Sequence, residues 1–164
     1  MLDKIAVQIL QILQRKARIP NVEVARQVGM APSAVLERIR KLENQGYIEG
    51  YEVRLNPLRF NRRLVTFAFV YPRTDADIDA LGGRLAALPA VQEVHYVSGE
   101  DAYLIKLRTA DTAALSQLLR DHLRRFKEVR SVRSLIVLAS VKESSHIPID
   151  AEATTDVSGP DGNK

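Results

Sequence analysis

The sequence predicts an α+β protein with an N-terminal unit of three helices and a C-terminal unit that combines a sheet with two helices. Two observations support this prediction. Apolar residues recur at helical spacing over residues 2–45, and a glycine separates the second helical stretch from the third. From residue 64 on, strand-like and helical stretches follow each other in the order β-α-β-β-α-β. This order is the split βαβ, or ferredoxin-like, arrangement.

The first helix is expected from about Leu2 to Leu13. Its apolar residues recur at helical spacing, and Asp3 lies in the first turn, where a carboxylate interacts favourably with the helix dipole. The next two helices lie within residues 21–48 and are separated at Gly29, which can adopt a positive φ without steric cost. Together the three helices predict a small core.

Three further residues are expected to mark the ends of the helix pair. Asn21 is expected to cap the first helix of the pair, and Pro32 suits the first position of the second helix. Gly46 is a natural residue to follow the last turn of that helix. Two short helices around a glycine turn predict a helix-turn-helix of winged-helix-like type, whose second helix enters the major groove of DNA.

One face of the second helix carries the candidate DNA-binding residues. The opposite face is apolar and is expected to face the core. Arg38 and Lys41 are predicted to contact phosphates, whereas Ser33, Ala34 and Glu37 are predicted to lie at or near base edges, because the start of a recognition helix reaches the bases. Two plainer readings stay open: Lys41 as a solvated surface charge, and Arg38 in an ion pair with Glu37 or Glu43.

The charge distribution favours DNA binding by this part of the chain. Residues 1–63 hold 12 Lys and Arg against 6 Asp and Glu, a net charge of +6. The corresponding net charges are +1 for residues 64–143 and −3 for residues 144–164. The positive excess therefore coincides with the helix pair, where the neutralisation of phosphates requires it.

The chain divides into four predicted parts. Residues 1–50 form the helix-turn-helix domain, and residues 51–63 form a linker strand, because apolar residues alternate from Tyr47 to Leu55. Residues 64–143 form the ferredoxin-like domain, which is also expected to mediate oligomerisation. Residues 144–164 lack apolar periodicity and are expected to be a disordered acidic tail.

The second domain is expected to contain four strands and two helices. The strands are predicted over residues 64–71, 91–97, 103–108 and 129–141, and the helices over residues 75–88 and 111–126. Helices cover only one face of such a sheet. The other face is also expected to be largely apolar, because Phe67 and Phe69 alternate with apolar neighbours. An uncovered apolar face indicates an interface, and we expect homodimerisation through the sheets.

Composition excludes several classes of site. The chain has no cysteine, which rules out disulfides and thiolate sites, and the spacing of His95, His122 and His146 is not that of metal ligands. No catalytic triad, glycine-rich phosphate loop or paired carboxylates are recognisable, so an enzyme is not expected. The sequence shows neither a signal peptide nor a membrane-spanning stretch, and a cytoplasmic protein without membrane partners is expected.

The ordered set of short motifs resembles the Lrp/AsnC family, the feast-famine regulators, from Met1 to about Val141. In the first half the matching residues are Leu2-Asp3, Ile9-Leu10, Arg18, Ala25, Gly29-Met30, Val35, Arg38-Ile39, Leu42-Glu43, Gly46 and Ile48-Glu49-Gly50-Tyr51. In the second half the matching stretch runs from Val97 to Leu104. The resemblance implies a DNA-binding domain joined to an effector domain, with dimers that often form octamers or higher rings.

The resemblance also implies an effector site, near the turn at residues 98–103. A small effector, typically an amino acid, would bind there between dimers. The expected effector-binding residues are His95, Ser98, Gly99, Glu100, Asp101 and Tyr103. Gly99 would let the backbone approach the ligand, turn amides would hold its carboxylate, and Asp101 or Glu100 would take its ammonium group. A plain hairpin turn without a ligand is the alternative.

The chain departs from the family pattern at three positions. Ala6 stands where an acidic residue is usual, and Asn61 stands where glycine is common. Ala31 replaces the usual serine cap of the recognition helix, a change that costs about 1 kcal/mol unless another contact replaces the cap. These departures leave the DNA target and the fine geometry open.

The sequence thus predicts a homo-oligomeric transcriptional regulator that responds to a non-covalently bound amino acid and has no other cofactor. Its partners would be double-stranded DNA, at a roughly palindromic site, and further copies of itself. Two alternatives are an architectural DNA-binding protein without an effector and, less favoured, a ferredoxin-like enzyme that binds a small molecule. The operator, the effector, the direction of regulation, and dimer against octamer stay open.

Overall fold

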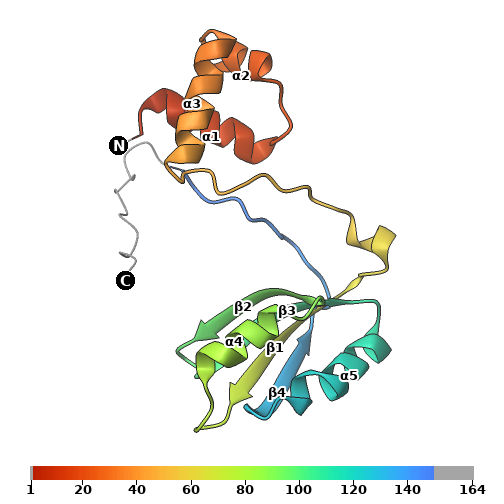
Figure 1. Cartoon of the computed structure of the whole chain (residues 1–164). Helices are drawn as coiled ribbons and strands as arrows, with labels where there is room; N and C mark the ends of the chain where they lie inside the picture. Colours follow the sequence, from red (N-terminus) through yellow and green to blue (C-terminus); the bar gives the residue numbers. More distant parts are fainter. Residues whose placement is uncertain (1, 150–164) are drawn as a thin grey trace. The chain divides into compact units, whose positions relative to one another are not determined.

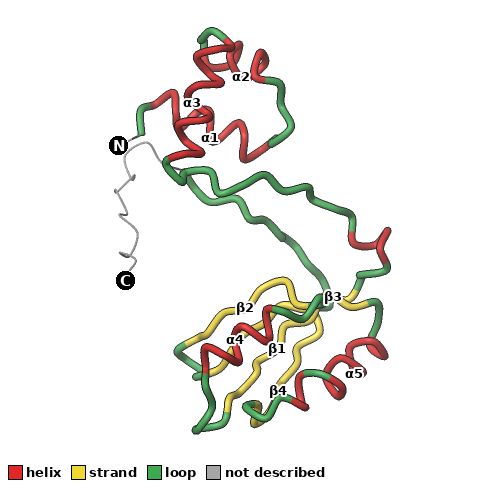
Figure 2. Tube along the Cα trace, in the orientation of Figure 1, coloured by secondary structure: helices red, strands yellow, loops and turns green. Residues whose placement is uncertain are grey.

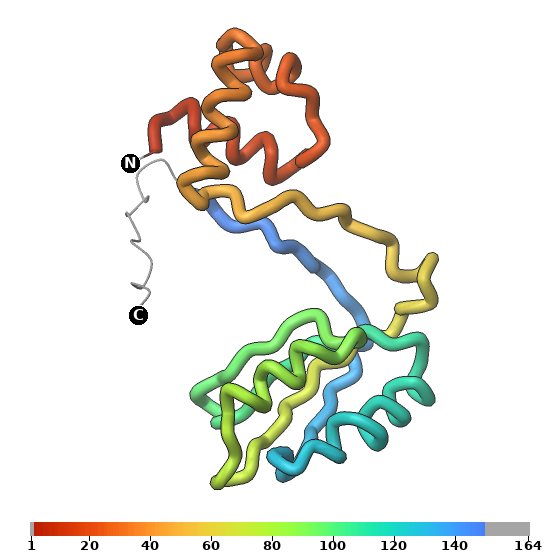
Figure 3. The backbone as a smooth tube through the Cα atoms, in the orientation of Figure 1, coloured from red at the N-terminus to blue at the C-terminus, as the bar shows by residue number. Residues whose placement is uncertain are grey.

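The chain folds into two compact units (Figure 1). A computed structural model describes residues 2–149. Among these residues, the first unit comprises 2–54 and 143–149, and the second unit comprises Leu55–Lys142. The chain therefore passes between the units twice, once after the third helix and once after the last strand (Figure 3).

The first unit is a three-helix domain, as predicted. Helix α1 spans Lys4–Arg15, α2 spans Asn21–Val28 and α3 spans Pro32–Asn44. The apolar stripes of the three helices meet in one core, whose buried members are Ala6, Ile9, Leu10, Leu13, Val24, Ala25, Val35, Ile39 and Leu42. The helical periodicity of the sequence thus identified the face of each helix that is buried.

The helix ends agree in part with those predicted from the sequence. Gly29 and Gly46 adopt left-handed conformations, with φ of 69° and 74°, as expected for residues that end helices. Asn21 does not cap α2: it is the first helical residue, and the N-cap position is Pro20. Neither α2 nor α3 has a side-chain hydrogen bond at its N-cap, which for α3 follows from Ala31 at that position.

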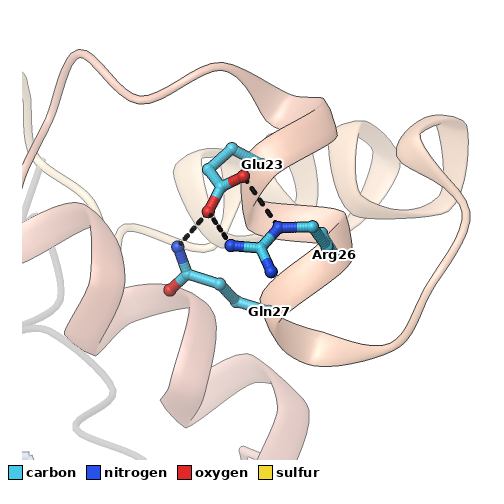
Figure 4. A network of polar contacts seen from close by, with 3 residues as sticks. All are labelled: Glu23, Arg26 and Gln27. Atoms are coloured by element: carbon cyan, nitrogen blue, oxygen red, sulfur yellow. Dashed lines mark hydrogen bonds and ion pairs between the residues drawn. The ribbon is translucent and has the colours of Figure 1, made fainter.

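Helix α2, which begins without a side-chain cap, contains a charged network in its first two turns (Figure 4). The Glu23 carboxylate accepts hydrogen bonds from Nη2 of Arg26 at 2.7 Å and from Nε2 of Gln27 at 2.9 Å. The hydrogen bond from Arg26 is the main reason that the pKa of Glu23 falls to about 2. Glu23 therefore stays ionised in the first turn, where a negative charge is favourable.

The second unit has the predicted ferredoxin-like arrangement (Figure 2). Its elements are β1 (Leu64–Pro72), α4 (Ile78–Ala86), β2 (Val91–Val97), β3 (Ala102–Thr109), α5 (Thr112–Asp121), the short 3₁₀ helix η2 (Leu123–Arg125) and β4 (Val129–Ile136). The four strands form one sheet in the order β2-β3-β1-β4, and all three neighbouring pairs are antiparallel.

Helices α4 and α5 cover the same face of this sheet. Leu81 and Leu85 of α4 and Leu115 of α5 pack with residues from the central strands β1 and β3. The register pairs Phe67 with Lys106 and Phe69 with Leu104, so these side chains lie on the opposite face. We call this opposite surface the open face, and in the single chain its two phenylalanines are half-buried.

Several elements differ from the predicted bounds for physical reasons. Helix α4 begins late because Asp77 is its N-cap, with its side chain accepting a hydrogen bond from the amide of Ala80 at 3.0 Å. Helix α5 likewise starts after the Asp111 cap and ends at Asp121, before η2. Strand β4 ends at Ile136, after which only the amide of Val137 still bonds to β1.

The alternation over residues 47–55 predicted a strand or short hairpin, and residues 51–63 a linker strand, but no strand forms over residues 47–63. This stretch has no partner strand for its backbone groups, and residues 57–60 form a short 3₁₀ helix, η1 (Pro57–Phe60), instead. The apolar side chains that suggested a half-buried strand are exposed, with Val53 at 82% and Leu55 at 61%. Alternation alone therefore gave the wrong structure here, because a strand also requires pairing.

The described residues 143–149, here called the C-terminal segment, pack on the first unit. Gln14 of α1 holds the backbone of Ile147: its Oε1 accepts from the Ile147 amide at 2.6 Å, and its Nε2 donates to the Ile147 carbonyl at 3.0 Å. Gln11 donates to the carbonyl of Ile149 at 3.2 Å, and Ile149 packs against the helical core. The rest of the expected disordered tail, residues 150–164, lies outside the described residues.

We predict that Gln14→Ala loosens the C-terminal segment. The variant removes both hydrogen bonds to Ile147, and we expect the free energy of unfolding of the first unit to fall by about 1 kcal/mol. Urea unfolding measures the change in the free energy of unfolding. Hydrogen exchange of the α1 amides shows whether the loss falls on the first unit. Gln8→Ala, at an exposed position of the same helix, is the control. Equal stability of the two variants would contradict the prediction.

Candidate DNA-binding and effector sites

The residues predicted to bind DNA gather on one side of α3. Ser33, Glu37 and Lys41 are exposed, and Ala34 and Arg38 are partly exposed. An open depression on this surface is lined by Ala34, Glu37, Arg38 and Lys41, together with Asp3 and Met30. Helix α3 thus presents basic, acidic and small side chains in one place, as a helix that enters a groove would require.

Arg38 forms an ion pair that the sequence analysis did not anticipate. Its Nη1 lies 2.6 Å from Oδ2 of Asp3, and the two side chains are 34% and 54% exposed. The alternatives considered were pairs with Glu37 or Glu43. Glu43 instead accepts a hydrogen bond from the hydroxyl of Tyr51 at 2.8 Å. Burial and this hydrogen bond raise the pKa of Tyr51 to about 12.

Asp3 has two roles at the start of α1. Its Oδ1 accepts a hydrogen bond from the amide of Ala6 at 2.7 Å, and its Oδ2 faces Arg38. The hydrogen bond from Ala6 is the larger cause of a lowered pKa of Asp3, and Arg38 adds to it. Asp3 is therefore ionised at neutral pH and connects the N-terminus of α1 to the middle of α3.

The turn between β2 and β3 contains four of the predicted effector residues, Ser98 to Asp101. Asp101 has a positive φ of 52°, and its carboxylate accepts a hydrogen bond from the Tyr96 hydroxyl at 2.6 Å. Gly99 does not have a left-handed conformation, and no described atom lies within 4 Å of the position of a Cβ there. The described part of the chain therefore does not itself require glycine at this position.

Glu100 joins this turn to the two other strands of the sheet. Its Oε2 accepts a hydrogen bond from the Tyr71 hydroxyl of β1 at 2.6 Å, and its Oε1 lies 3.3 Å from Nη2 of Arg133 in β4. The guanidinium of Arg133 also lies over the Phe69 ring, 4.8 Å from its centroid. The hydrogen bond to Glu100 raises the pKa of Tyr71. A polar cluster thus adjoins the open face.

Tyr103 lies on the helix-covered face of the sheet, where its ring contacts that of Tyr96, the partner of Asp101. Tyr103 is 7% exposed in the core under α4, and its hydroxyl donates to the carbonyl of Ile78 at 2.8 Å. His95 is exposed and pairs in register with Leu104, on the open face, with its Nε2 3.6 Å from Oε2 of Glu93. Strand alternation separates the two residues because Tyr103 and Leu104 point to opposite faces. The structure thus gives Tyr103 a packing role.

Sequence reasoning missed the partners of these residues. Asp3 was noted only for the helix dipole, and Tyr71 and Arg133 were not considered for the effector site. The alternation of β1 places Tyr71 on the same face as Phe69, which is a usable signal. The contacts to Glu100, however, depend on the strand order β3-β1-β4, which the sequence pattern alone does not give.

Two kinds of feature are not found among residues 2–149. This part of the chain contains no group of three or more His, Cys, Asp or Glu side chains placed to hold a metal ion. It also contains no helix that is long and apolar enough to cross a membrane.

Comparison with known proteins identifies both units. A family model described as the Lrp/AsnC ligand binding domain matches residues 66–147, and a winged helix-turn-helix DNA-binding model matches residues 2–49. The chain belongs to the Lrp/AsnC family. Its relatives include the leucine-responsive regulatory proteins of Salmonella typhimurium and Escherichia coli K12, each 37% identical over 150 residues, which cover 90% of this chain and 92% of the relative.

Solved structures show the same relationship. A transcriptional regulator from Neisseria meningitidis, crystallised as an L-Met complex, is 31% identical with a TM-score of 0.87, over 90% of this chain and 97% of that one. AsnC of Escherichia coli is 25% identical with a TM-score of 0.83, over 90% and 99% of the two chains. The predicted family and fold class are confirmed. This Lrp/AsnC protein is an effector-responsive transcriptional regulator with a DNA-binding and a ligand-binding domain.

We predict that Gly82→Ala destabilises the second unit because of Tyr103. A Cβ at Gly82 would lie 2.6 Å from the Tyr103 hydroxyl, so the variant should lower the free energy of unfolding by about 1–3 kcal/mol. Gly83→Ala is the matched control: its Cβ meets no described atom within 4 Å, and alanine favours a helix by up to about 1 kcal/mol. Urea unfolding of both variants measures the difference, and equal effects would contradict the packing role of Tyr103.

Proposed function

We propose that the protein binds specific DNA sites through α3 and that an amino acid, bound near the turn at residues 98–101, changes this binding. The observation that supports the DNA site best is the surface of α3, where Ser33, Ala34, Glu37, Arg38 and Lys41 lie together within residues 1–63, the stretch with the positive charge excess. Arg38 and Lys41 would contact phosphates, and the residues near the start of the helix would face base edges.

The proposed effector site consists of His95, Ser98, Gly99, Glu100 and Asp101. Support comes from His95 and Glu100, which lie at one end of the open face, where Glu100 already contacts a phenol and a guanidinium. Asp101 belongs to the same turn, and its carboxylate is bound by the Tyr96 hydroxyl. Successive backbone amides in a turn can form a concavity that suits an effector carboxylate. A related regulator was crystallised with L-Met, which supports an amino acid as the ligand class. Tyr103 would support this site only by packing.

We further propose that two copies of the chain pair through their open faces. This surface carries Phe67, Phe69, Leu104 and Leu135, and Leu135 is 48% exposed in the single chain. Uncovered apolar surface of this kind indicates a protein interface. A dimer would also present two recognition helices to a roughly palindromic site, and octamers would follow from further contacts between dimers. The effector would then favour one assembly by binding it more tightly.

We predict that Arg38→Ala weakens DNA binding by about tenfold without changing the oligomer, because a charge-assisted contact to a phosphate is lost. The probe is a duplex selected by the protein from a random-sequence library, titrated at a fixed salt concentration. The mass from light scattering checks the assembly. Arg26→Ala is the control, since Arg26 is held by Glu23 on α2. Unchanged affinity of the Arg38 variant would contradict this DNA-binding surface.

We predict that Gly99→Val abolishes the response to the effector while DNA binding survives. A Cβ at residue 99 would have no described atom within 4 Å apart from its chain neighbours, so we expect the domain to fold, whereas the added side chain would occupy the space of a ligand close to the backbone. Calorimetric titration with each of the twenty amino acids identifies the ligand and measures its affinity. Gly83→Ala, in α4 of the same unit and away from the turn, is the control. Wild-type effector affinity in the valine variant would place the site elsewhere.

A further inference from the structure

The ion pair between Asp3 and Arg38 lies within the proposed DNA-binding surface. The Asp3 carboxylate lines the same open depression as Ala34, Glu37, Arg38 and Lys41. Its Oδ2 lies 2.6 Å from Nη1 of Arg38, in a pair that is 54% exposed on the Asp3 side. A side chain proposed to contact a phosphate is thus already bound to an anionic oxygen of the protein.

The geometry leaves Arg38 only partly satisfied. A guanidinium has five N–H donors in a planar fork, which match a carboxylate or a phosphate best through two parallel bonds. Arg38 donates to Asp3 through Nη1 to Oδ2, whereas Oδ1 accepts the amide of Ala6 at 2.7 Å in the cap of α1, so the pair is not the two-bond fork. A phosphate has more than one oxygen to offer and can therefore replace this single bond by a better one.

Asp3 keeps its role as the N-cap of α1 when Arg38 leaves the ion pair. The cap uses Oδ1 and the ion pair uses Oδ2, so α1 keeps its N-terminal hydrogen bond when Arg38 turns away. The pair also lies at the surface, where an ion pair contributes little to stability and breaks at low cost. Both features suit an interaction that is exchanged on binding.

We propose that Asp3 is an intramolecular competitor of DNA for Arg38. In the free protein the Asp3 carboxylate holds the guanidinium, and in the complex a phosphate takes it over. The competition lowers the affinity for DNA in general, because a phosphate contact carries no sequence information. The inference rests on the proposed contact between Arg38 and DNA, and it names Asp3 as a further residue that sets the strength of binding.

The decisive variant is Asp3→Asn. Asparagine caps helices about as well as aspartate does, so α1 keeps its cap while the charge that holds Arg38 is removed. We expect the affinity for the selected duplex, and for a scrambled duplex of equal length, to rise by up to about fivefold. The gain should shrink as the salt concentration increases, because salt screens the competing pair. Unchanged or weaker binding would overturn the proposal.

A double-mutant comparison separates competition from simple repulsion between Asp3 and DNA. If Asp3 competes for Arg38, Asp3→Asn gains more affinity in the wild-type background than in the Arg38→Ala background. Equal gains in both backgrounds would show repulsion alone and would overturn the proposal. Glu49→Gln, which removes a carboxylate from the loop after α3, controls for the change in net charge. Asp3→Ala shows the separate effect of losing the cap, as a lower melting temperature.

The same variants distinguish the inference from the proposed function. If Arg38→Ala leaves DNA affinity unchanged, Arg38 does not contact DNA and the proposed function fails at this residue. If Arg38→Ala weakens binding but Asp3→Asn does not strengthen it, Arg38 contacts DNA without leaving Asp3, and only the competition is wrong. The side-chain NMR signals of Arg38 give an independent measurement. They should shift on Asp3→Asn and again on addition of DNA.

Discussion

The antiparallel pairing of β1 and β3 is the constraint on which the second unit depends. Pairing across this central pair puts Ala68, Val70, Ile105 and Leu107 under the helices, fully buried. The same pleat puts Phe67, Phe69 and Leu104 on the open face. A slip of one residue would exchange the two sets, so the buried side fixes the register and thereby the composition of the other side.

This register also positions the turn proposed to bind the effector. Because β1 pairs with β3 up to Val70 and Tyr103, the turn before β3 lies beside the end of β1, where Glu100 reaches Tyr71. Strand β4 pairs with the other edge of β1 and brings Arg133 to the same carboxylate. A ligand or a second chain at this end of the open face would therefore contact groups from two strands and the turn at once.

The first unit depends less on regular capping than on contacts between distant parts of the chain. Two of its three helices begin without a side-chain cap. Asp3 joins α1 to α3, and the C-terminal segment adds Ile149 to the core and hydrogen bonds to α1. A small three-helix core buries little surface, so such additions matter more than they would in a larger domain. They also make residues beyond the last strand part of the DNA-binding unit.

The sequence by itself determined the two domains, the order of their elements, the buried faces of the helices and the family, because these follow from periodicity and short local motifs. Local sequence patterns gave wrong predictions where contacts with residues distant in the sequence determine the structure. Residues 47–55 alternate like a strand but find no neighbour, and Tyr103 and His95 stand near one turn in the sequence but face opposite sides of the sheet. Only the tertiary structure decided that Arg38 pairs with Asp3, that Glu100 joins Tyr71 and Arg133, and that Gln14 holds Ile147. These contacts join residues 29 to 133 positions apart, and a separation of that size is closed by packing rather than by any pattern along the chain.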